Sequence, residues 1–196
     1  MEKARLTRLF FMIALLTGAM VIVSCGGKRQ AASPYSGMGT ELVLPCSDNE
    51  FFSDRTHFRG TGMAEGTNLA STRRRANLDA NASLAASVNR TIRSVSDRYT
   101  QDITVGDANE FAERFEDLTR SVVNQSLNNV STVCSKVFER EGRYSVYVAV
   151  EVDKDEMMND ISSRISRDDR LRLDYDRMKF ERIFDEEMEK LSNERP

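Results

Sequence analysis

The sequence is poor in the residues from which catalytic and metal sites are usually built. Among its 196 residues His57 is the only histidine, and spacing assigns it no aspartate or serine partner. CxxC and HExxH motifs and paired histidine and cysteine ligands are missing too, so a transition metal would lack its usual donors. We therefore expect no catalytic residue, no metal and no cofactor, and we expect a protein that acts by contact rather than an enzyme.

The chain also lacks a hydrophobic run long enough to span a membrane. One apolar run extends from Leu9 to Val23, and no second one follows it. It comprises about fifteen residues, whereas a helix that crosses the hydrocarbon layer needs roughly twenty. Basic residues precede this run and Cys25 follows it closely, an arrangement typical of a targeting segment. We predict that residues 1–24 are a signal peptide.

Ile22, Val23, Ser24 and Cys25 form a tetrad that matches the bacterial lipobox. In that pattern small or aliphatic residues admit the lipoprotein signal peptidase, and the cysteine sulfur carries a diacylglycerol. An ordinary secretory peptide with a cysteine at this point is the alternative. Each buried methylene contributes about 0.8 kcal/mol, so two or three acyl chains make a stable anchor. The tetrad thus predicts lipidation of Cys25 and attachment to a membrane.

The charge balance argues against a nucleic-acid partner. The formal net charge of −3 becomes −5 without residues 1–24, because that segment carries three basic residues and one acidic residue. Residues 25–46 are rich in glycine, serine, alanine and proline, which predicts a flexible tether behind the lipidated cysteine. Residues 47–196 are enough for one domain of ordinary size.

Cys46 and Cys134 are the two remaining cysteines. An exported chain passes through an oxidising compartment, where a disulfide between them can persist. Closing a loop of this length would stabilise the fold by up to about 4 to 5 kcal/mol. Two separate thiols are the alternative, since the sequence does not show that the side chains meet.

The stretch 57–66 carries three glycines and one aromatic residue, which predicts a short strand closely approached by another backbone. A phosphate-cradling loop is disfavoured, because no Lys-Ser/Thr pair follows the glycines. A long helix should follow, with an alanine-lined first half that can lie close to a sheet. Its apolar positions recur every three or four residues: Ala76, Ala80, Leu84, Val88, Ile92, Val95 and Tyr99. Arg73, Arg74 and Arg75 precede this face, and we interpret them as solvated rather than as an anion clamp.

A second helix is predicted after Asp107, which would cap it. Its apolar positions are Phe111, Phe115, Leu118 and Val122. A hairpin should run from Val130 to Val152 around Gly142 and bury a valine face. One or two amphipathic helices, interrupted around 167–172, should follow. These elements predict an α+β fold in which helices cover a small antiparallel sheet, in the order β-α-α-β-β-α.

Two acidic clusters are the remaining candidates for chemistry: Asp168 with Asp169, and Asp185 with Glu186 and Glu187. They could hold calcium or act as paired carboxylates. We interpret them as surface charges, because basic residues adjoin them and no glycine-punctuated ligand loop surrounds them.

Several features occur in the order seen in one family: the lipobox, the glycine-bearing strand, the alanine-rich helix opened by basic residues, and a hairpin that ends in VYVAVEVDKDEM. In this the chain resembles the Lpp-twenty family of bacterial outer-membrane lipoproteins, in the form common among the Bacteroidetes. The resemblance extends from about Leu44 through the charged C-terminal segment. It implies an α+β domain attached to the outer membrane and facing the periplasm, and it supplies no active-site residues.

We expect a non-enzymatic lipoprotein of the cell envelope, attached to the membrane through the lipid on Cys25, that serves as a structural or protein-interaction module with an envelope protein as partner. One alternative is an outer-membrane regulator of a cell-wall synthase. Another, from a different class, is an envelope hydrolase with an unrecognised site.

Overall fold

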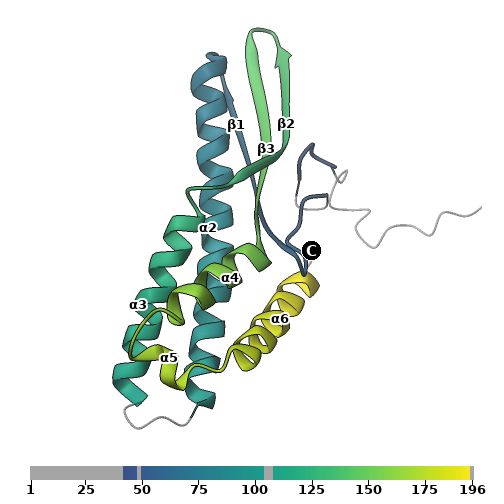
Figure 1. The fold of residues 1–196 in the computed structure, drawn as a ribbon. Coiled ribbons are helices and arrows are strands. Elements are labelled where there is room, and N and C mark those ends of the chain that lie inside the picture. The colour runs from purple at the N-terminus through teal and green to yellow at the C-terminus, as the bar shows by residue number, and fades with distance from the viewer. Residues whose placement is uncertain (1–41, 48–49, 104–107, 195–196) are drawn as a thin grey trace, which may run out of the picture. The chain divides into compact units, whose positions relative to one another are not determined.

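The computed structural model describes residues 42–47, 50–103 and 108–194 (Figure 1). Every helix and strand of the described residues belongs to one compact unit, Val43–Pro196. The strands are β1 (His57–Gly66), β2 (Ser131–Arg140) and β3 (Arg143–Asp153). The helices are α2 (Leu69–Asp102), α3 (Ala108–Ser126), α4 (Lys154–Ile165), α5 (Leu171–Asp174) and α6 (Arg177–Asn193). This order of elements confirms the predicted α+β fold.

The three strands form an antiparallel sheet in the order β1-β3-β2. The central strand β3 pairs with β1 so that Val148 lies opposite Gly62, and with β2 so that Val146 lies opposite Val137. Glu141 and Gly142 join the hairpin with φ values of 54° and 74°. Two positive φ values in a two-residue loop match the right-handed twist of the flanking strands. The predicted turn therefore sets the hairpin register.

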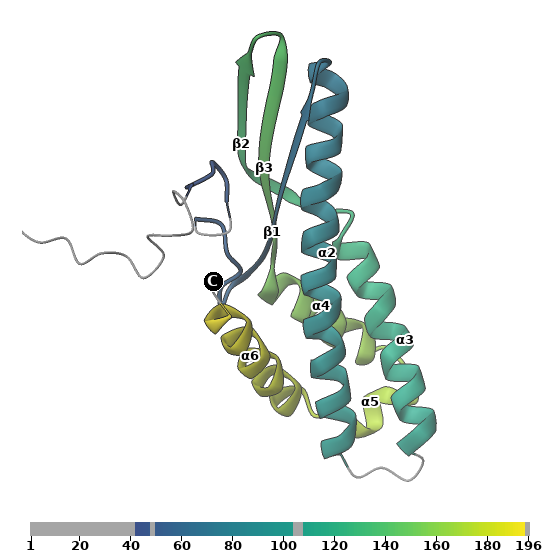
Figure 2. The same ribbon diagram turned by 180° about the vertical axis from the view of Figure 1, so that it is seen from behind.

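Strict alternation in β3 separates the two faces of the sheet. Val146, Val148, Val150 and Val152 all point to one side and are buried. Helix α2 lies along this side, next to β1 and β3 (Figures 1 and 2). The valine face is thus covered by the long helix that the periodicity predicts.

Two glycines of β1 allow α2 to lie very close to the sheet. A Cβ atom added to Gly60 would stand 2.3 Å from the Leu84 nitrogen, and one added to Gly62 would stand 2.2 Å from the Ala80 nitrogen. Only a residue without a Cβ fits such a backbone contact. The first half of α2 presents buried alanines here, so the predicted close approach of strand and helix is confirmed.

Larger side chains fill the space beyond the sheet, where α3 and α6 pack against the second half of α2. Tyr99 of α2 stacks on Phe115 of α3 with 5.0 Å between ring centroids and meets Phe180 of α6 edge-on at 5.6 Å. Its hydroxyl accepts the Asp176 N–H at 2.8 Å. Tyr175 joins the same cluster, and its hydroxyl lies 2.8 Å from the Ser162 hydroxyl. This aromatic cluster connects the consecutive helices α2 and α3 with α6, which is distant from both in sequence.

The C-terminal part forms three helical segments where the sequence predicts one or two. Asp168 explains the extra break, because its carboxylate accepts the N–H groups of Arg170 and Leu171 and starts the short helix α5. Asp153 and Asp176 cap α4 and α6 by accepting N–H groups of their first turns. The predicted cap Asp107 lies outside the described residues.

Alanine at Gly60 or Gly62 should lower the free energy of unfolding by about 3 kcal/mol or more, because the new methyl group meets backbone that cannot step aside. Gly66→Ala is the matched control. Its added Cβ would first meet side-chain atoms, Thr72 Oγ1 at 2.5 Å and Arg75 Nη2 at 2.8 Å, which can move. Urea unfolding measures all three variants, and equal losses would contradict the close-contact model.

The fold should lose stability in alkali through Tyr99 and Tyr175. Burial raises the pKa of both hydroxyls from 10.0 to about 12. Between these values the unfolded chain binds fewer protons than the folded one, so the free energy of unfolding falls as pH rises above about 10. The contribution is complete below pH 10. Urea unfolding across this range, with tyrosinate absorbance as a second signal, should show a smaller fall in a Tyr99→Phe, Tyr175→Phe variant.

Candidate functional site

The predicted lipid attachment site, Cys25, and the predicted signal peptide 1–24 lie outside the described residues. Of the predicted tether 25–46, the structure describes 42–46. Within the described ranges, no helix combines the length and the apolar character needed to cross a membrane.

Cys46 and Cys134 form a disulfide, with 5.7 Å between their Cα atoms. Cys134 lies in β2 directly opposite Ala149 of β3, on the side of the sheet away from α2. Cys46 is only 2% exposed, and Ala149 is fully buried. The bond therefore holds the start of the domain against this second face of the sheet.

His57 opens β1 beside three carboxylates. Its Nε2 lies 3.6 Å from Asp153 and 3.9 Å from Glu151, and its Nδ1 lies 4.0 Å from Asp54. The Thr56 hydroxyl stands 2.9 Å from Nδ1 and also donates to Asp54 at 2.7 Å. The nearest hydroxyl is thus already held in a turn, where Asp54 also accepts the N–H groups of Thr56 and His57.

Arg59 ties this turn to the sheet. Its guanidinium contacts Asp54 at 2.5 Å and Glu151 at 2.9 Å. Partial burial by itself would raise the pKa of Asp54, but hydrogen bonds from Thr56, Arg59 and His57 outweigh it and hold that pKa well below its usual range. The same carboxylates raise the pKa of Arg59 against the effect of burial. These charges satisfy one another, as in a structural network.

A polar cavity of about 540 Å³ adjoins His57 and carries Glu151, Asp153 and two serines in its wall. Ser126 donates to the Val122 carbonyl at 3.2 Å, as a serine in the last turn of a helix commonly does. Ser131 is exposed at the start of β2. No hydrogen bond between His57 and a serine occurs among the residues described, so the geometry does not assemble a nucleophile with its base.

The acidic clusters are engaged in ion pairs. Asp168 forms an ion pair with Arg114 of α3 at 3.0 Å. Arg98 of α2 pairs with Glu186 at 2.5 Å and with Glu187 at 2.7 Å. Asp185 receives Lys154 at 2.6 Å. Asp169 pairs with Arg172 at 3.4 Å. In the described part of the chain, no group of three or more histidine, cysteine, aspartate or glutamate residues is placed to hold a metal ion.

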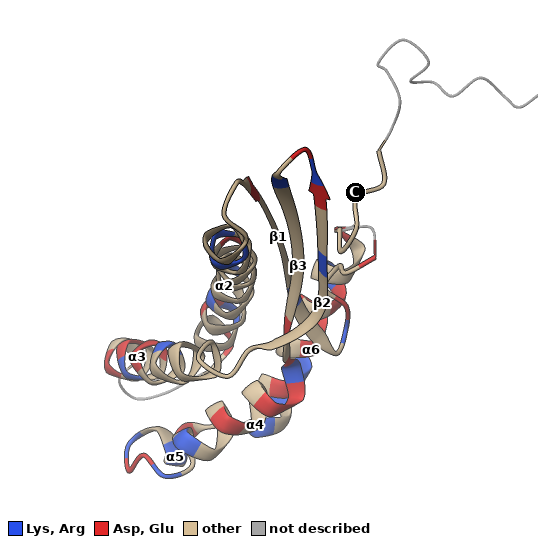
Figure 3. Cartoon of the chain, turned by 90° about the horizontal axis from the view of Figure 1, so that it is seen from above, with Lys and Arg blue, Asp and Glu red and all other residues tan. Residues whose placement is uncertain are grey.

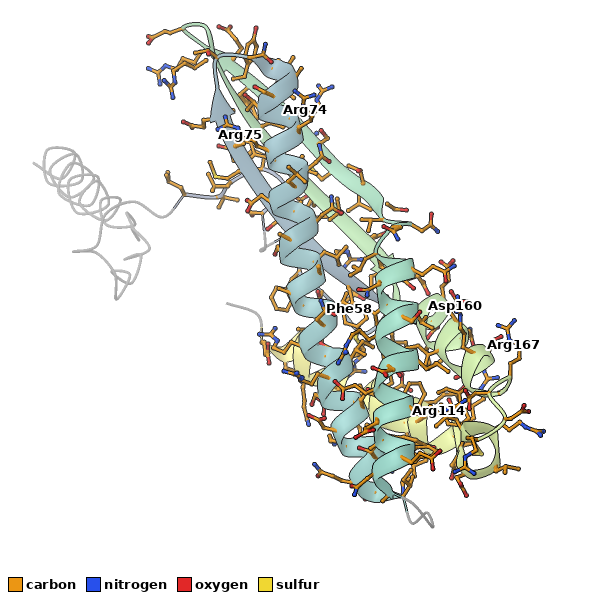
Figure 4. All side chains as sticks on the ribbon, turned by 90° about the vertical axis from the view of Figure 1, so that its left-hand side faces the viewer. Phe58, Arg74, Arg75, Arg114, Asp160 and Arg167 are labelled. Carbon is orange, nitrogen blue, oxygen red and sulfur yellow. A yellow bond between two sulfur atoms is a disulfide. The ribbon has the colours of Figure 1, made fainter. Side chains whose placement is uncertain are left out.

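The arginine run before the apolar face of α2 is exposed. Arg74 and Arg75 extend from the N-terminal part of α2 (Figure 4). Arg114 belongs to α3, which lies beside the C-terminal half of α2. Arg75 donates to the backbone carbonyl of Glu65, so it fastens the turn between β1 and α2. This agrees with a solvated face rather than an anion clamp.

The face of the sheet opposite α2 carries exposed apolar side chains near the hairpin turn. Met63 of β1 lies opposite Tyr147 of β3, and Phe138 of β2 meets Tyr147 edge-on at 5.9 Å. Met63 remains 44% exposed and Phe138 50% exposed. We call Met63, Phe138 and Tyr147 the hairpin patch. Figure 3 shows α2 on the other side of the sheet and the hairpin charges gathered toward the turn.

Sequence reasoning found the valine face of β3 but missed the hairpin patch. The sequence does contain a signal for the patch. In β3 the residues between the buried valines point to the other face of the sheet, and Tyr147 is one of them. Period-2 patterns do not show whether the second face is covered, because this depends on where α2 and the helices that follow β3 lie.

Comparison of the chain with protein-family models, with curated proteins and with solved structures finds no match in any of the three. The similarity to outer-membrane lipoproteins stays a prediction from the sequence.

Replacing Cys46 and Cys134 together by serine should lower the free energy of unfolding by up to about 4 to 5 kcal/mol, because the bond closes a loop of 88 positions in the unfolded chain. Thermal unfolding of the oxidised protein and of the double variant measures this. A reducing agent should destabilise the parent chain but leave the double variant unchanged. An equal response of both proteins would contradict the bond.

Proposed function

We propose that the protein is a non-enzymatic, lipid-anchored module of the cell envelope that binds a protein partner through the hairpin patch. The observation that carries the proposal is the exposure of Met63 and Phe138, beside the half-buried Tyr147, on the face of the sheet opposite the one where α2 buries the valines of β3. Methionine and aromatic residues are enriched at the centres of protein interfaces.

The surroundings of the patch support a protein partner. Lys136 lies opposite Tyr147 on the same face, and Glu65 accepts a hydrogen bond from Ser145 at 3.2 Å beside it. Polar groups around an apolar centre are the usual arrangement of an interface. The β2 edge strand, exposed on both faces along most of its length, adds further accessible surface.

The place where the chain enters the domain also supports the proposal. The disulfide joins Cys46 to Cys134, on the same face of the sheet as the patch. Cys134 lies opposite Ala149, which is two residues further along β3 than Tyr147. The segment between Cys25 and Cys46 would span roughly 25 Å on average as a flexible tether. A lipid on Cys25 would then keep the patch within reach of proteins in or at the membrane.

A photo-crosslinking residue, benzoylphenylalanine, placed at Met63 in intact cells should give a reproducible adduct with an envelope protein. The same residue at Met178, an 82% exposed methionine of α6, is the matched control and should not give that adduct. Mass spectrometry of the copurified protein identifies it. Adding Cys25→Ala should abolish the adduct, because the anchor is lost. Identical products from Met63 and Met178, or none from Met63, would rule out the hairpin patch as the interface.

A further inference from the structure

A second cavity lies between α2 and α3, on the other side of α2 from the proposed interface. The two helices run side by side beyond the sheet (Figures 1 and 4). The cavity has a volume of about 580 Å³ and is formed by the α2 stretch around Ile92 and the α3 stretch around Val123. Neither the hairpin patch nor the network around His57 contributes to it.

The wall of this cavity is basic. Arg90, Arg93 and Arg120 all line it, against one lining carboxylate, Glu116. Arg93 makes no hydrogen bond or ion pair with any residue that the structure describes. The guanidinium group presents a planar fork of donors that fits phosphate oxygens two at a time.

The other two arginines are held by exposed pairs. Arg90 contacts Glu194 at 3.2 Å, and Arg120 contacts Glu116 at 2.6 Å and Asp117 at 3.6 Å. The side chains in these pairs are all more than half exposed, so water screens them and an incoming anion can replace them at small cost. All three guanidinium groups are therefore available to a ligand.

Thr119 contributes an independent sign of a ligand. This residue of α3 lines the cavity and is 1% exposed, and its hydroxyl has no hydrogen-bond partner among the described residues. Hydroxyls elsewhere on the helices behave differently, since those of Thr72, Thr100 and Ser126 each donate to the carbonyl four residues earlier. A buried hydroxyl without a partner is costly and calls for an explanation such as an acceptor supplied from outside.

We propose that the cavity between α2 and α3 binds a phosphate group, with Arg93 and Arg120 on its oxygens and the Thr119 hydroxyl donating to one of them. Ile92 and Val123 supply the apolar wall for the carbon skeleton that carries the phosphate. Both a soluble phosphate monoester and a phospholipid head group have this chemistry.

The test uses the full lipidated protein in a non-ionic detergent. Methyl NMR signals of Ile92, Thr119 and Val123 are followed while inorganic phosphate, glycerol 3-phosphate or short-chain phosphatidylglycerol is added, with sodium chloride at equal ionic strength as the reference. Saturable shifts with glycerol 3-phosphate or inorganic phosphate indicate a soluble ligand. Shifts with the lipid alone indicate a head group. No saturable shift with any of the three overturns the proposal.

Two variants and a matched control test the assignment of residues. Arg93→Gln should weaken binding roughly tenfold, the effect of removing one charge-assisted contact. Arg74→Gln removes an exposed arginine from the same helix at its sheet-covered end and should leave binding unchanged (Figure 4). Equal weakening by both would show general charge attraction and overturn the site.

Thr119→Val separates a ligand role from a packing role. The variant keeps the shape of the side chain and removes the unpaired hydroxyl, so the melting temperature without ligand should stay the same or rise, while phosphate binding weakens severalfold. Unchanged binding would remove Thr119 from the site and overturn the proposed geometry. A fall in both stability and binding would assign Thr119 a packing role and would also overturn it.

Discussion

The backbone of α2 lies directly against the backbone of β1, and the positions of the other elements follow from this contact. The helix backbone lies so close to the strand at Gly60 and Gly62 that neither position has room for a side chain. On the helix side, Ala80 contributes only a small side chain to this contact. Because β3 pairs with β1, its valines meet the same helix. One close contact thus fixes the separation of helix and sheet for the whole upper part of the domain.

Helix α2 continues past the sheet and changes its packing there. Its apolar positions become larger, and Tyr99 contacts Phe115 and Phe180 from two other helices. The helix therefore joins a thin sheet layer, where small residues dominate, to a wider helical layer held by aromatic rings. Ion pairs such as Arg98 with Glu187 connect α2 and α6 where the two helices meet.

The two candidate binding surfaces lie on opposite sides of this framework and use different chemistry. The hairpin patch is largely apolar and partly exposed, and it lies on the sheet face that α2 does not cover. The cavity between α2 and α3 is basic, with a buried hydroxyl in its wall. A tether from a lipid on Cys25 would join the domain at Cys46, on the same side of the sheet as the patch.

Local pattern was enough for all the described elements except the short helix α5, because strand and helix periods follow from backbone geometry and appear in neighbouring residues. The glycines of β1, the alanines of α2 and the alternating valines of β3 made the α+β fold predictable. Contacts between distant residues were not predictable in this way. Cys46 meets Cys134 across 88 positions, and Thr119 lines the same cavity as two arginines of α2, only because the chain folds back on itself. Which faces stay uncovered was likewise decided by the packing of α2, since a period shows that a strand has two faces but not what lies against each.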